Sequence, residues 1–260
     1  MSPLFFPEVA VVSEIWYADR MPHISIVIPA YNEADRLPET LALVRDYLEQ
    51  QSFEAEVLVV DDGSTDDTVK KVQEMQERFP QLKLIANEKN KGKGGVVRQG
   101  MLAAQGDYRL FMDADYATPI TELDKFLPYL GQFDIIIGSR YLNGGSIRVK
   151  QPLQRRIVSR IGNLLIQQSL LRGIVDTQCG FKLFTAAAAE RVFKKQSMDG
   201  WVFDVEVLSI ARQLGLTIKE ISVDWYDAKQ SKLRAVHAAA KSYSDLKVVK
   251  KKIREGAYLD

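Results

Sequence analysis

The sequence predicts an α/β domain with a mostly parallel central sheet and helices on both faces. Short apolar runs alternate along the chain with longer segments of helical periodicity, a pattern typical of sheets whose strands run in parallel. Polar clusters follow the first, second and fourth apolar runs. Because ligands of such sheets bind beyond the carboxyl ends of the strands, we expect these clusters to form one site.

The elements of the first half are each marked by their residues. The first strand ends at Pro29, and the helix after it carries its leucines and valine on one stripe. The second strand is nearly continuous in apolar residues, and Thr65 and Asp66 are the expected N-caps of a helix that runs to about Phe79. The expected strands are residues 24–28, 56–60, 82–86, 108–112 and 134–138, and the other expected helices are residues 36–51, 92–105 and 118–130.

The pattern changes after the fifth strand. The expected elements are a loop at 143–146, an amphipathic helix at 155–171, a helix at 203–214, a strand at 217–223 and a terminal helix at 235–255 that becomes basic towards its end. The predicted organisation is an N-terminal extension (1–22), a main domain (23–232) and a basic C-terminal helix or tail (233–260).

Composition excludes several classes of protein. Lys and Arg number 35 against 34 Asp and Glu, so no overall field would recruit nucleic acid. A single cysteine, Cys179, excludes an intrachain disulfide and suits a reducing cytosol. The N-terminus lacks a signal-peptide pattern, and no apolar run reaches the ~20 residues of a membrane-spanning helix. We therefore expect a cytoplasmic protein that is soluble or lies on the cytosolic surface of a membrane.

Asp113-Ala114-Asp115 follows the fourth strand and is the most informative motif. Alternation along a strand places residues i and i+2 on one face, so both carboxylates can reach the same cleft. Like charges this close are costly unless a cation or a proton lies between them. A hard divalent ion that also binds substrate phosphates suits such a pair.

Several motifs in fixed order resemble the family-2 glycosyltransferases, which have the GT-A fold. Within that family the chain is most similar to the polyprenyl-phosphate sugar synthases. The segments that carry the resemblance are IPAYNE at 28–33, VDDGSTD at 60–66, NKGKG at 90–94, DAD at 113–115, GSRY at 138–141 and DTQCGFK at 176–182, with weaker similarity from 201 to 232.

The resemblance implies a nucleotide-sugar site at the strand ends. The residues it implies there are Pro29, Ala30, Tyr31, Glu33, Asp61, Asp62, Lys93, Asp113, Ala114 and Asp115. Asp61 is the favoured residue to accept a hydrogen bond from the base, and Asp62 is the second candidate. A turn with a helix cap is the alternative role for these two aspartates, and a simple helix start is the alternative for the turn around Lys93.

The resemblance further implies that Asp113 and Asp115 bind Mg²⁺ or Mn²⁺, which would bridge the nucleotide diphosphate. Dolichol-phosphate mannose synthases can add a glutamine two positions after the second aspartate. Ala117 stands there in this chain, so water or phosphate is the expected third ligand.

An acceptor phosphate is anionic at pH 7 and needs cations more than a general base. Arg140 is the first candidate cation for catalysis and for the acceptor phosphate, and Lys182 is a weaker candidate; a surface arginine at a strand end is the alternative for Arg140. Further candidates, beside or on the amphipathic helix where the resemblance implies that the lipid phosphate docks, are Arg155, Arg156 and Arg160. An ordinary solvated helix face is the alternative there.

Asp204 completes the candidate catalytic residues, as a base or as a group that positions the sugar. Its alternative role is structural pairing with an arginine or lysine.

Together these features predict an inverting transfer of a hexose to polyprenyl or dolichyl phosphate. UDP-glucose is favoured as the donor over GDP-mannose, because segments 176–184 and 203–206 look more like the glucosyl branch. The alternatives are a soluble family-2 enzyme with a hydroxyl acceptor, or a catalytically silent nucleotide-sugar-binding protein.

Overall fold

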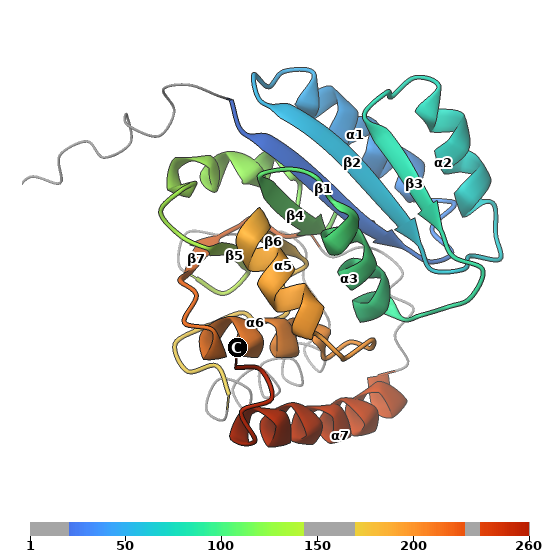
Figure 1. Cartoon of the computed structure of the whole chain (residues 1–260). Coiled ribbons are helices and arrows are strands. Elements are labelled where there is room, and N and C mark those ends of the chain that lie inside the picture. Colours follow the sequence, from blue (N-terminus) through green and yellow to red (C-terminus); the bar gives the residue numbers. More distant parts are fainter. Residues whose placement is uncertain (1–20, 143–169, 227–234, 260) are drawn as a thin grey trace, which may run out of the picture.

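The computed structural model describes residues 21–142, 170–226 and 235–259, with the first nine residues of the last range described by their backbone alone. A seven-stranded sheet of order β3-β2-β1-β4-β6-β5-β7 forms its centre (Figure 1). The strands are β1 His23–Ala30, β2 Glu54–Asp61, β3 Leu82–Ala86, β4 Tyr108–Met112, β5 Ile135–Ser139, β6 Phe181–Thr185 and β7 Ile218–Ser222. The helices are α1 Leu37–Leu48, α2 Thr68–Gln76, α3 Lys93–Ala103, α5 Ala186–Lys195, α6 Phe203–Gln213 and α7 Ala235–Arg254, with 3₁₀ turns η1 Ile120–Lys125 and η2 Leu127–Tyr129.

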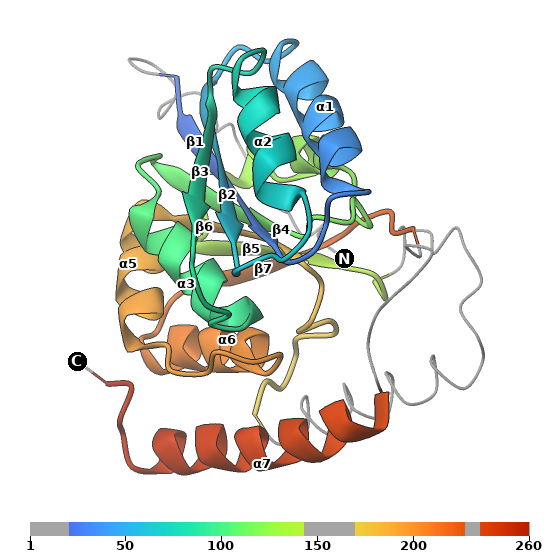
Figure 2. The ribbon, with the colours of Figure 1, turned by 90° about the vertical axis from the view of Figure 1, so that its right-hand side faces the viewer.

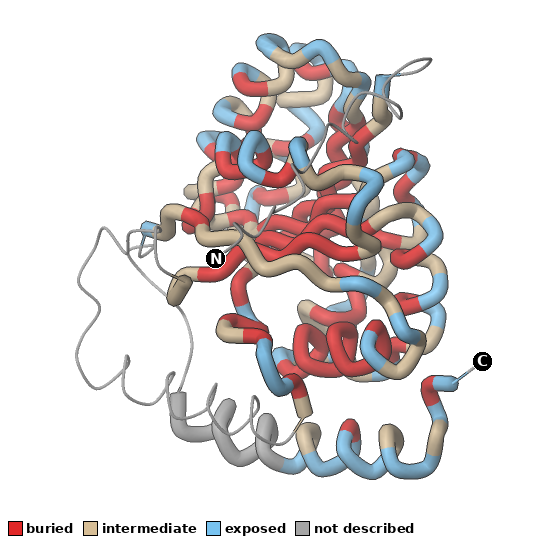
Figure 3. Tube along the Cα trace, turned by 90° about the vertical axis from the view of Figure 1, so that its left-hand side faces the viewer, coloured by how far each residue is buried: buried red, intermediate tan, exposed pale blue. Residues whose placement is uncertain are grey.

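Two apolar layers sandwich the sheet, because neighbouring strand residues point to opposite faces. Ile26 of β1 packs in the layer beneath α1 and α2, whereas Val27 packs in the layer beneath α3, α5 and α6. The strands β1, β2, β4, β5 and β6 are buried along most of their length, whereas the edge strands β3 and β7 are mostly half-buried or exposed (Figure 3). Figure 2 places α7 outside α6, and the buried side chain of Val249 anchors it there. The prediction of an α/β fold with helices on both faces is confirmed.

The sequence interpretation missed β6 and α5. β6 lies between β4 and β5 and runs antiparallel to both, whereas the pairs β1–β2, β1–β4, β2–β3 and β5–β7 are parallel. The strand β6 has only five residues and follows Gly180, and α5 begins immediately after it. Thr185 is the N-cap of α5 and accepts a hydrogen bond from the Ala188 amide. No turn residues separate the two elements, so neither stood out in the sequence.

The helix expected at 118–130 is wrong. This segment forms η1 and η2, with i to i−3 hydrogen bonds such as Phe126 N–H to the Leu123 carbonyl. Pro128 carries no amide hydrogen and therefore cannot extend an α-helix through this point. The cap expected at Thr65 or Asp66 is also displaced: Asp67 holds the N-cap position of α2, without a side-chain bond.

The other described elements match their expected ranges to within one to three residues at each end. The amphipathic segment 155–171 lies outside the described residues except for its last two positions, and so does the first part of the N-terminal extension. No helix in the described ranges is long and apolar enough to cross a membrane.

Candidate active site

The carboxyl ends of β1, β2 and β4 lie side by side and bring the polar clusters together. Ala30 at the end of β1 is paired with Asp61 at the end of β2, and Asp113 follows the last residue of β4. Pro29 and Ala30 are themselves buried strand residues, whereas Tyr31 is among the exposed large side chains of the described chain. The rim of the site therefore begins at Tyr31.

Hydrogen bonds join the loops after β1 and β2. The Asn32 amide donates to Ser64 Oγ at 2.8 Å, and Asn32 Oδ1 accepts from the Thr65 amide at 2.8 Å. Asn32 has φ of +53°, a conformation that asparagine tolerates better than most residues. Glu33 forms a two-point ion pair with Arg36 on the next turn, at 2.6 and 2.8 Å. The Asn32 contacts join the two loops, and the Glu33–Arg36 pair ties the first loop to the start of α1.

Asp61 and Asp62 both bind backbone amides. Asp61 Oδ2 accepts from the amides of Gly63 and Ser64 at 3.0 Å, and Asp62 accepts from the amides of Lys91 and Gly92. Burial raises the pKa of Asp62 above its usual range, although these amides oppose the shift. The turn-forming role weighed for this pair is thus present, and a contact with the base stays a prediction.

Lys93 forms an ion pair with Asp113 at the amino end of α3. Its Nζ lies 2.7 Å from Asp113 Oδ1, and the two side chains are 19% and 30% exposed. Burial alone would lower the pKa of Lys93, but the carboxylates of Asp113 and Asp204 outweigh it and raise that pKa. Lys93 therefore stays charged and is part of the same cluster as the Asp-Ala-Asp motif.

Asp115 lies in a tight loop that is anchored to α1. The Ala114 carbonyl accepts from Thr40 Oγ1 at 2.8 Å, and Asp115 Oδ1 accepts from the Ala117 amide at 3.1 Å. Burial raises the pKa of Asp115, and the Asp113 carboxylate raises it further. The motif therefore contains two carboxylates whose repulsion a bound cation would relieve.

Beneath this motif, Lys182 and Asp204 form a second ion pair, now fully inside the protein. Lys182 Nζ lies 2.5 Å from Asp204 Oδ1 and also donates to the Cys179 carbonyl at 2.6 Å. The two side chains are only 1% and 6% exposed. Burial raises the pKa of Asp204 above its usual range, against the opposing effect of Lys182. The structural pairing weighed for Asp204 is what the geometry contains.

Arg140, the expected phosphate-binding cation, is held by a buried carboxylate. Its Nε and Nη2 donate to the two oxygens of Asp176, at 2.7 and 2.9 Å, and its backbone amide adds a third bond at 3.0 Å. Burial would raise the pKa of Asp176, but Arg140 outweighs it and the pKa is lowered. Tyr141 and Trp225 lie against the guanidinium, at 5.2 and 5.6 Å from their ring centres. Much of the hydrogen-bonding capacity of Arg140 is therefore already committed.

The helix arginines expected to hold the acceptor, Arg155, Arg156 and Arg160, lie outside the described residues. Their role stays a prediction.

The donor set at Asp113 and Asp115 suits a hard divalent ion. Both side chains offer carboxylate oxygens, which Mg²⁺ and Mn²⁺ prefer, and burial together with the neighbouring Asp113 carboxylate raises the pKa of Asp115. Among the described residues no group of three or more His, Cys, Asp or Glu is arranged to hold a metal. Two protein ligands with the rest supplied by substrate or water is the arrangement that this set allows.

Sequence comparison decides the family. Residues 25–193 match the sequence profile described as glycosyl transferase family 2. This chain is a family-2 glycosyltransferase. Among its relatives are dolichyl-phosphate beta-glucosyltransferases of Trichomonas vaginalis (39% identical, covering 82% of this chain and 68% of the relative) and Homo sapiens (35%, covering 90% and 77%).

Solved structures agree on the fold. Mannosyl-3-phosphoglycerate synthase from Rubrobacter xylanophilus is 18% identical, with a TM-score of 0.67 over 92% of this chain and 76% of that one. Glucosyl-3-phosphoglycerate synthase from Mycobacterium tuberculosis, crystallised with Mn²⁺, UDP-glucose and phosphoglyceric acid, is 18% identical, with a TM-score of 0.66 over 88% and 80%. The GT-A fold expected from the sequence is thereby confirmed.

Within this glycosyltransferase, Gly180 has a positioning role that the motif alone did not define. Its carbonyl accepts from the Asp113 amide at 3.1 Å, and a Cβ built on Gly180 would lie 2.1 Å from Asp113 Oδ2. Only glycine leaves room for the aspartate there. The sequence contains Gly180 in a recognisable segment, but its contact with a residue 67 positions away is set by the pairing of β4 with β6.

Trp201 and Glu206 were also missed as contributors to the site. Trp201 is 49% exposed, and its ring centre lies 4.9 Å from Lys93 Nζ. Glu206 is fully buried and accepts from the amides of Ser197 and Met198, in the segment that leads to Trp201. The weak similarity around 201–206 was the only sequence signal for them.

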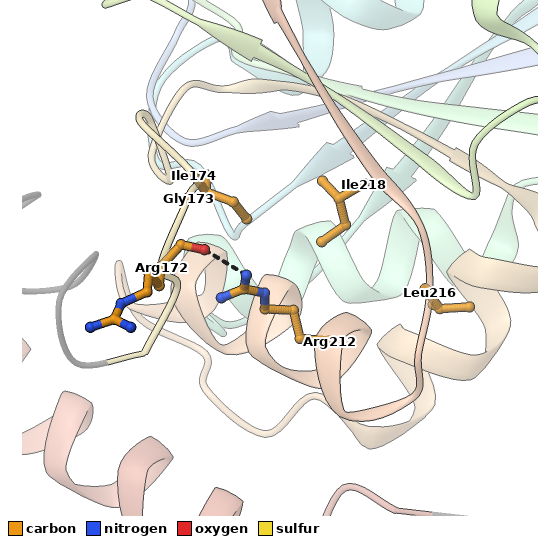
Figure 4. A pocket seen from close by; sticks show the side chains of 6 residues that line it. All are labelled: Arg172, Gly173, Ile174, Arg212, Leu216 and Ile218. Atoms are coloured by element: carbon orange, nitrogen blue, oxygen red, sulfur yellow. Dashed lines mark hydrogen bonds between the residues drawn. The ribbon is translucent and has the colours of Figure 1, made fainter.

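A separate hollow of about 290 Å³ lies away from these residues. Arg172, Arg212 and Ile218 help to line it, and Arg212 donates to the Arg172 carbonyl (Figure 4). Ile218 is the first residue of β7, which runs parallel to β5, so this hollow lies at the amino edge of the sheet. It is on the opposite edge from the Asp-Ala-Asp motif.

Proposed function

We propose that this glycosyltransferase moves glucose from UDP-glucose to dolichyl phosphate, or to another polyprenyl phosphate, with inversion at C1. The relatives named dolichyl-phosphate beta-glucosyltransferase support the sugar and the acceptor. The observation in this chain that carries the acceptor assignment is the buried pair of Lys182 and Asp204.

The reason lies in what each acceptor needs. A hydroxyl acceptor must lose a proton, so it needs a base free to take one. Asp204 was the candidate base, but its Oδ1 is bound to Lys182 beneath the site. A phosphate monoester is already anionic at pH 7. Its oxygen can attack C1 directly, the bond from C1 to the diphosphate breaks, and UDP departs with the electron pair; no proton has to move.

The charge balance of the site supports a divalent ion as its cofactor. Four cations of the site already have a carboxylate partner: Lys93 with Asp113, Lys182 with Asp204, Arg140 with Asp176 and Arg36 with Glu33. Asp115 adds one more negative charge. Binding a nucleoside diphosphate to such a site needs further positive charge.

Asp113 and Asp115 would hold Mg²⁺ or Mn²⁺ beside the diphosphate. When bound, the ion would offset the charge that develops on the departing UDP. Lys93 lies close enough to the motif to contribute a second cation, and Tyr31, Glu33, Asp61 and Asp62 border the part of the edge where the nucleoside would lie. The Mycobacterium tuberculosis enzyme of the same fold, which was crystallised with Mn²⁺ and UDP-glucose, supports this assignment.

Arg155, Arg156 and Arg160 are proposed to bind the acceptor phosphate, with Arg140 supporting its approach. One charge-assisted contact to phosphate contributes ~1.5–3 kcal/mol, so Arg156→Ala should raise the acceptor KM roughly tenfold to a hundredfold. The KM for UDP-glucose should stay unchanged. Steady-state kinetics with each substrate varied in turn measures both, and unchanged acceptor kinetics in all three single variants would refute this part.

A lipid acceptor implies work at the cytosolic surface of a membrane, and α7 is the proposed contact. The described end of α7 carries Lys247, Lys250, Lys251, Lys252 and Arg254, while Val249 and Tyr258 hold it to the domain. Each basic residue near an anionic surface contributes ~1 kcal/mol. Sedimentation with phosphatidylserine vesicles should therefore give salt-sensitive binding, and charge reversal at Lys250 and Lys251 should weaken it.

The deciding experiment compares acceptors and donors on the whole chain. With Mn²⁺ present, transfer from UDP-glucose to dolichyl phosphate is expected, with little transfer from GDP-mannose and none to dolichol, which differs only by lacking the phosphate. Excess EDTA should stop the reaction, and added Mn²⁺ should restore it. Efficient transfer to dolichol or another alcohol would favour the hydroxyl-acceptor alternative, and binding of UDP-glucose without transfer to any acceptor would favour a silent binding protein.

A further inference from the structure

We propose that the exposed indole of Trp201 is the surface on which the hexose of the donor packs, so that Trp201 helps the enzyme to bind UDP-glucose more tightly than UDP. This inference rests on the function proposed above and adds a residue to its donor site.

The position of Trp201 supports this role. The residue precedes α6, yet its ring lies 4.9 Å from Lys93 Nζ, and Lys93 Nζ lies 2.7 Å from Asp113 Oδ1. The hexose of a nucleotide-sugar is bonded directly to the diphosphate. A diphosphate held beside Asp113 and Lys93 therefore brings the hexose within reach of the indole.

The exposure of Trp201 is built into the fold, because the segment before it is fixed on α3. The Gly94 amide donates to the Asp199 carbonyl at 2.8 Å, and Arg98 pairs with the Asp199 side chain at 3.1 Å. Gln196 Nε2 donates to the Gly94 carbonyl at 2.9 Å. A Cβ on Gly94 would lie 2.4 Å from the Met198 carbonyl oxygen, so the two segments meet backbone to backbone.

The same segment is fixed from below by a buried carboxylate. Glu206 accepts from the amides of Ser197 and Met198 at 2.9 and 2.7 Å, and from Ser197 Oγ at 2.6 Å. The hydroxyl of Tyr258, after α7, donates to the same carboxylate at 2.7 Å. Satisfied buried networks of this kind are rigid. Trp201 is therefore held half exposed by a rigid support beside Lys93, and a ligand that covers the ring would remove apolar surface from water.

The surroundings of the ring favour a hexose over an isoprenoid chain. A hexose offers apolar C–H faces bordered by hydroxyl groups, so it needs one flat apolar surface with polar neighbours. Trp201 has such neighbours: the ammonium of Lys93 beside the ring and the exposed Asp199 two positions earlier in the chain. An isoprenoid chain would gain more from a continuous apolar patch, whereas a single aromatic ring among charged groups matches the sugar.

The test measures the binding of UDP-glucose and of UDP to the whole chain by calorimetry with Mn²⁺. Aromatic packing contributes roughly 0.5–1.5 kcal/mol, so Trp201→Ala should weaken UDP-glucose binding up to about tenfold. UDP binding should change less than about twofold, because UDP lacks the hexose. Trp201→Phe should restore most of the affinity. Leu43→Ala, which removes another exposed apolar side chain on α1, is the matched control and should change neither.

Any other outcome would contradict the role proposed for Trp201. The kind of outcome also shows whether the proposed function itself is affected. Equal weakening of UDP and UDP-glucose would mean that the ring acts on the nucleotide through Lys93. Unchanged donor binding with a raised KM for dolichyl phosphate would place the ring at the acceptor. In both cases an active wild-type enzyme leaves the proposed function standing, whereas a wild-type chain that binds neither ligand removes the proposed donor and this inference together.

Discussion

The two lysine–aspartate pairs of the site share their chemistry and differ in their surroundings. Lys93 and Asp113 lie at the mouth of the site, 19% and 30% exposed, whereas Lys182 and Asp204 lie beneath it, 1% and 6% exposed. Both ammonium groups lie near the ring of Phe111, 5.5 and 5.8 Å from its centre. The two pairs therefore lie close to the same aromatic side chain, although water reaches only the first of them.

Because the two ion pairs differ in exposure, we expect them to have different roles. A charge at the mouth of the site can exchange its partner for a ligand, because water screens the charge during the exchange. A buried charge cannot lose its partner without a large desolvation cost. We infer that the outer pair serves substrate binding and that the inner pair holds the floor of the site in shape.

Breaking the inner pair should give the largest effect on stability. Lys182→Met leaves Asp204 buried and unpaired, which should cost about 3–5 kcal/mol of unfolding free energy. The double variant Lys182→Met/Asp204→Leu should recover much of that loss, because no charge is then left buried. Urea unfolding of the three proteins measures both. Equal stability of the single variant and the wild type would contradict the assignment.

Arg140→Met should act similarly on Asp176, with a pH dependence. In the wild type, Arg140 lowers the pKa of Asp176, so this carboxylate stabilises the fold above its usual pKa of about 4, and the stabilisation is lost as the pH falls through the lowered folded value. In the variant, burial alone would raise that pKa. The variant should therefore be about 3 kcal/mol less stable than the wild type at pH 7, and this difference should shrink towards pH 4. If the difference in unfolding free energy between the variant and the wild type did not depend on pH, Asp176 would be excluded as its cause.

At the outer site, Asp113→Asn and Asp115→Asn should act on turnover. Charge stabilisation by a metal is worth several kcal/mol, so each change should lower kcat roughly a hundredfold to a thousandfold. The unfolding midpoint should change little, because neither side chain is fully buried in an ion pair as Asp204 is. Full turnover of either variant in EDTA-treated buffer would refute the metal assignment.

Gly180→Ala should have a smaller effect at the same place. The new Cβ would meet Asp113 Oδ2, so the aspartate must move, at a cost of about 1–3 kcal/mol for overpacking. Affinity for Mn²⁺, followed by its electron paramagnetic resonance signal, should fall together with activity. Gly173→Ala is a useful control, because a Cβ there meets nothing within 4 Å, although its positive φ adds some strain.

Lys93→Met should have the smallest effect on stability, about 1 kcal/mol, because water screens this partly exposed pair more than it screens the buried one. Its effect on function should be larger: the KM for UDP-glucose is expected to rise about tenfold, the loss of one charged contact to a diphosphate. A large loss of stability in this variant would place the outer pair in the same class as the inner one.

Much of the site could be predicted from the sequence, because its first strands alternate regularly with helices. That regularity places Ala30, Asp61 and Asp113 at one edge of the sheet without any knowledge of packing. The spacing of the two aspartates in the Asp-Ala-Asp motif likewise predicts that two negative charges lie close together and need a cation or a proton between them. The segment around Trp201 shows no such regularity, and its closeness to Lys93 was not predicted.

The sequence by itself determined the α/β class, the strand-end position of the site and the paired carboxylates, since each depends on residues close together in the chain. Only the tertiary structure decided which lysine meets which aspartate. Lys93 reaches Asp113 because α3 begins beside the end of β4, and Lys182 reaches Asp204 because β6 inserts antiparallel between β4 and β5. Burial then separates the two pairs, and burial is a property of packing that no local spacing of residues encodes.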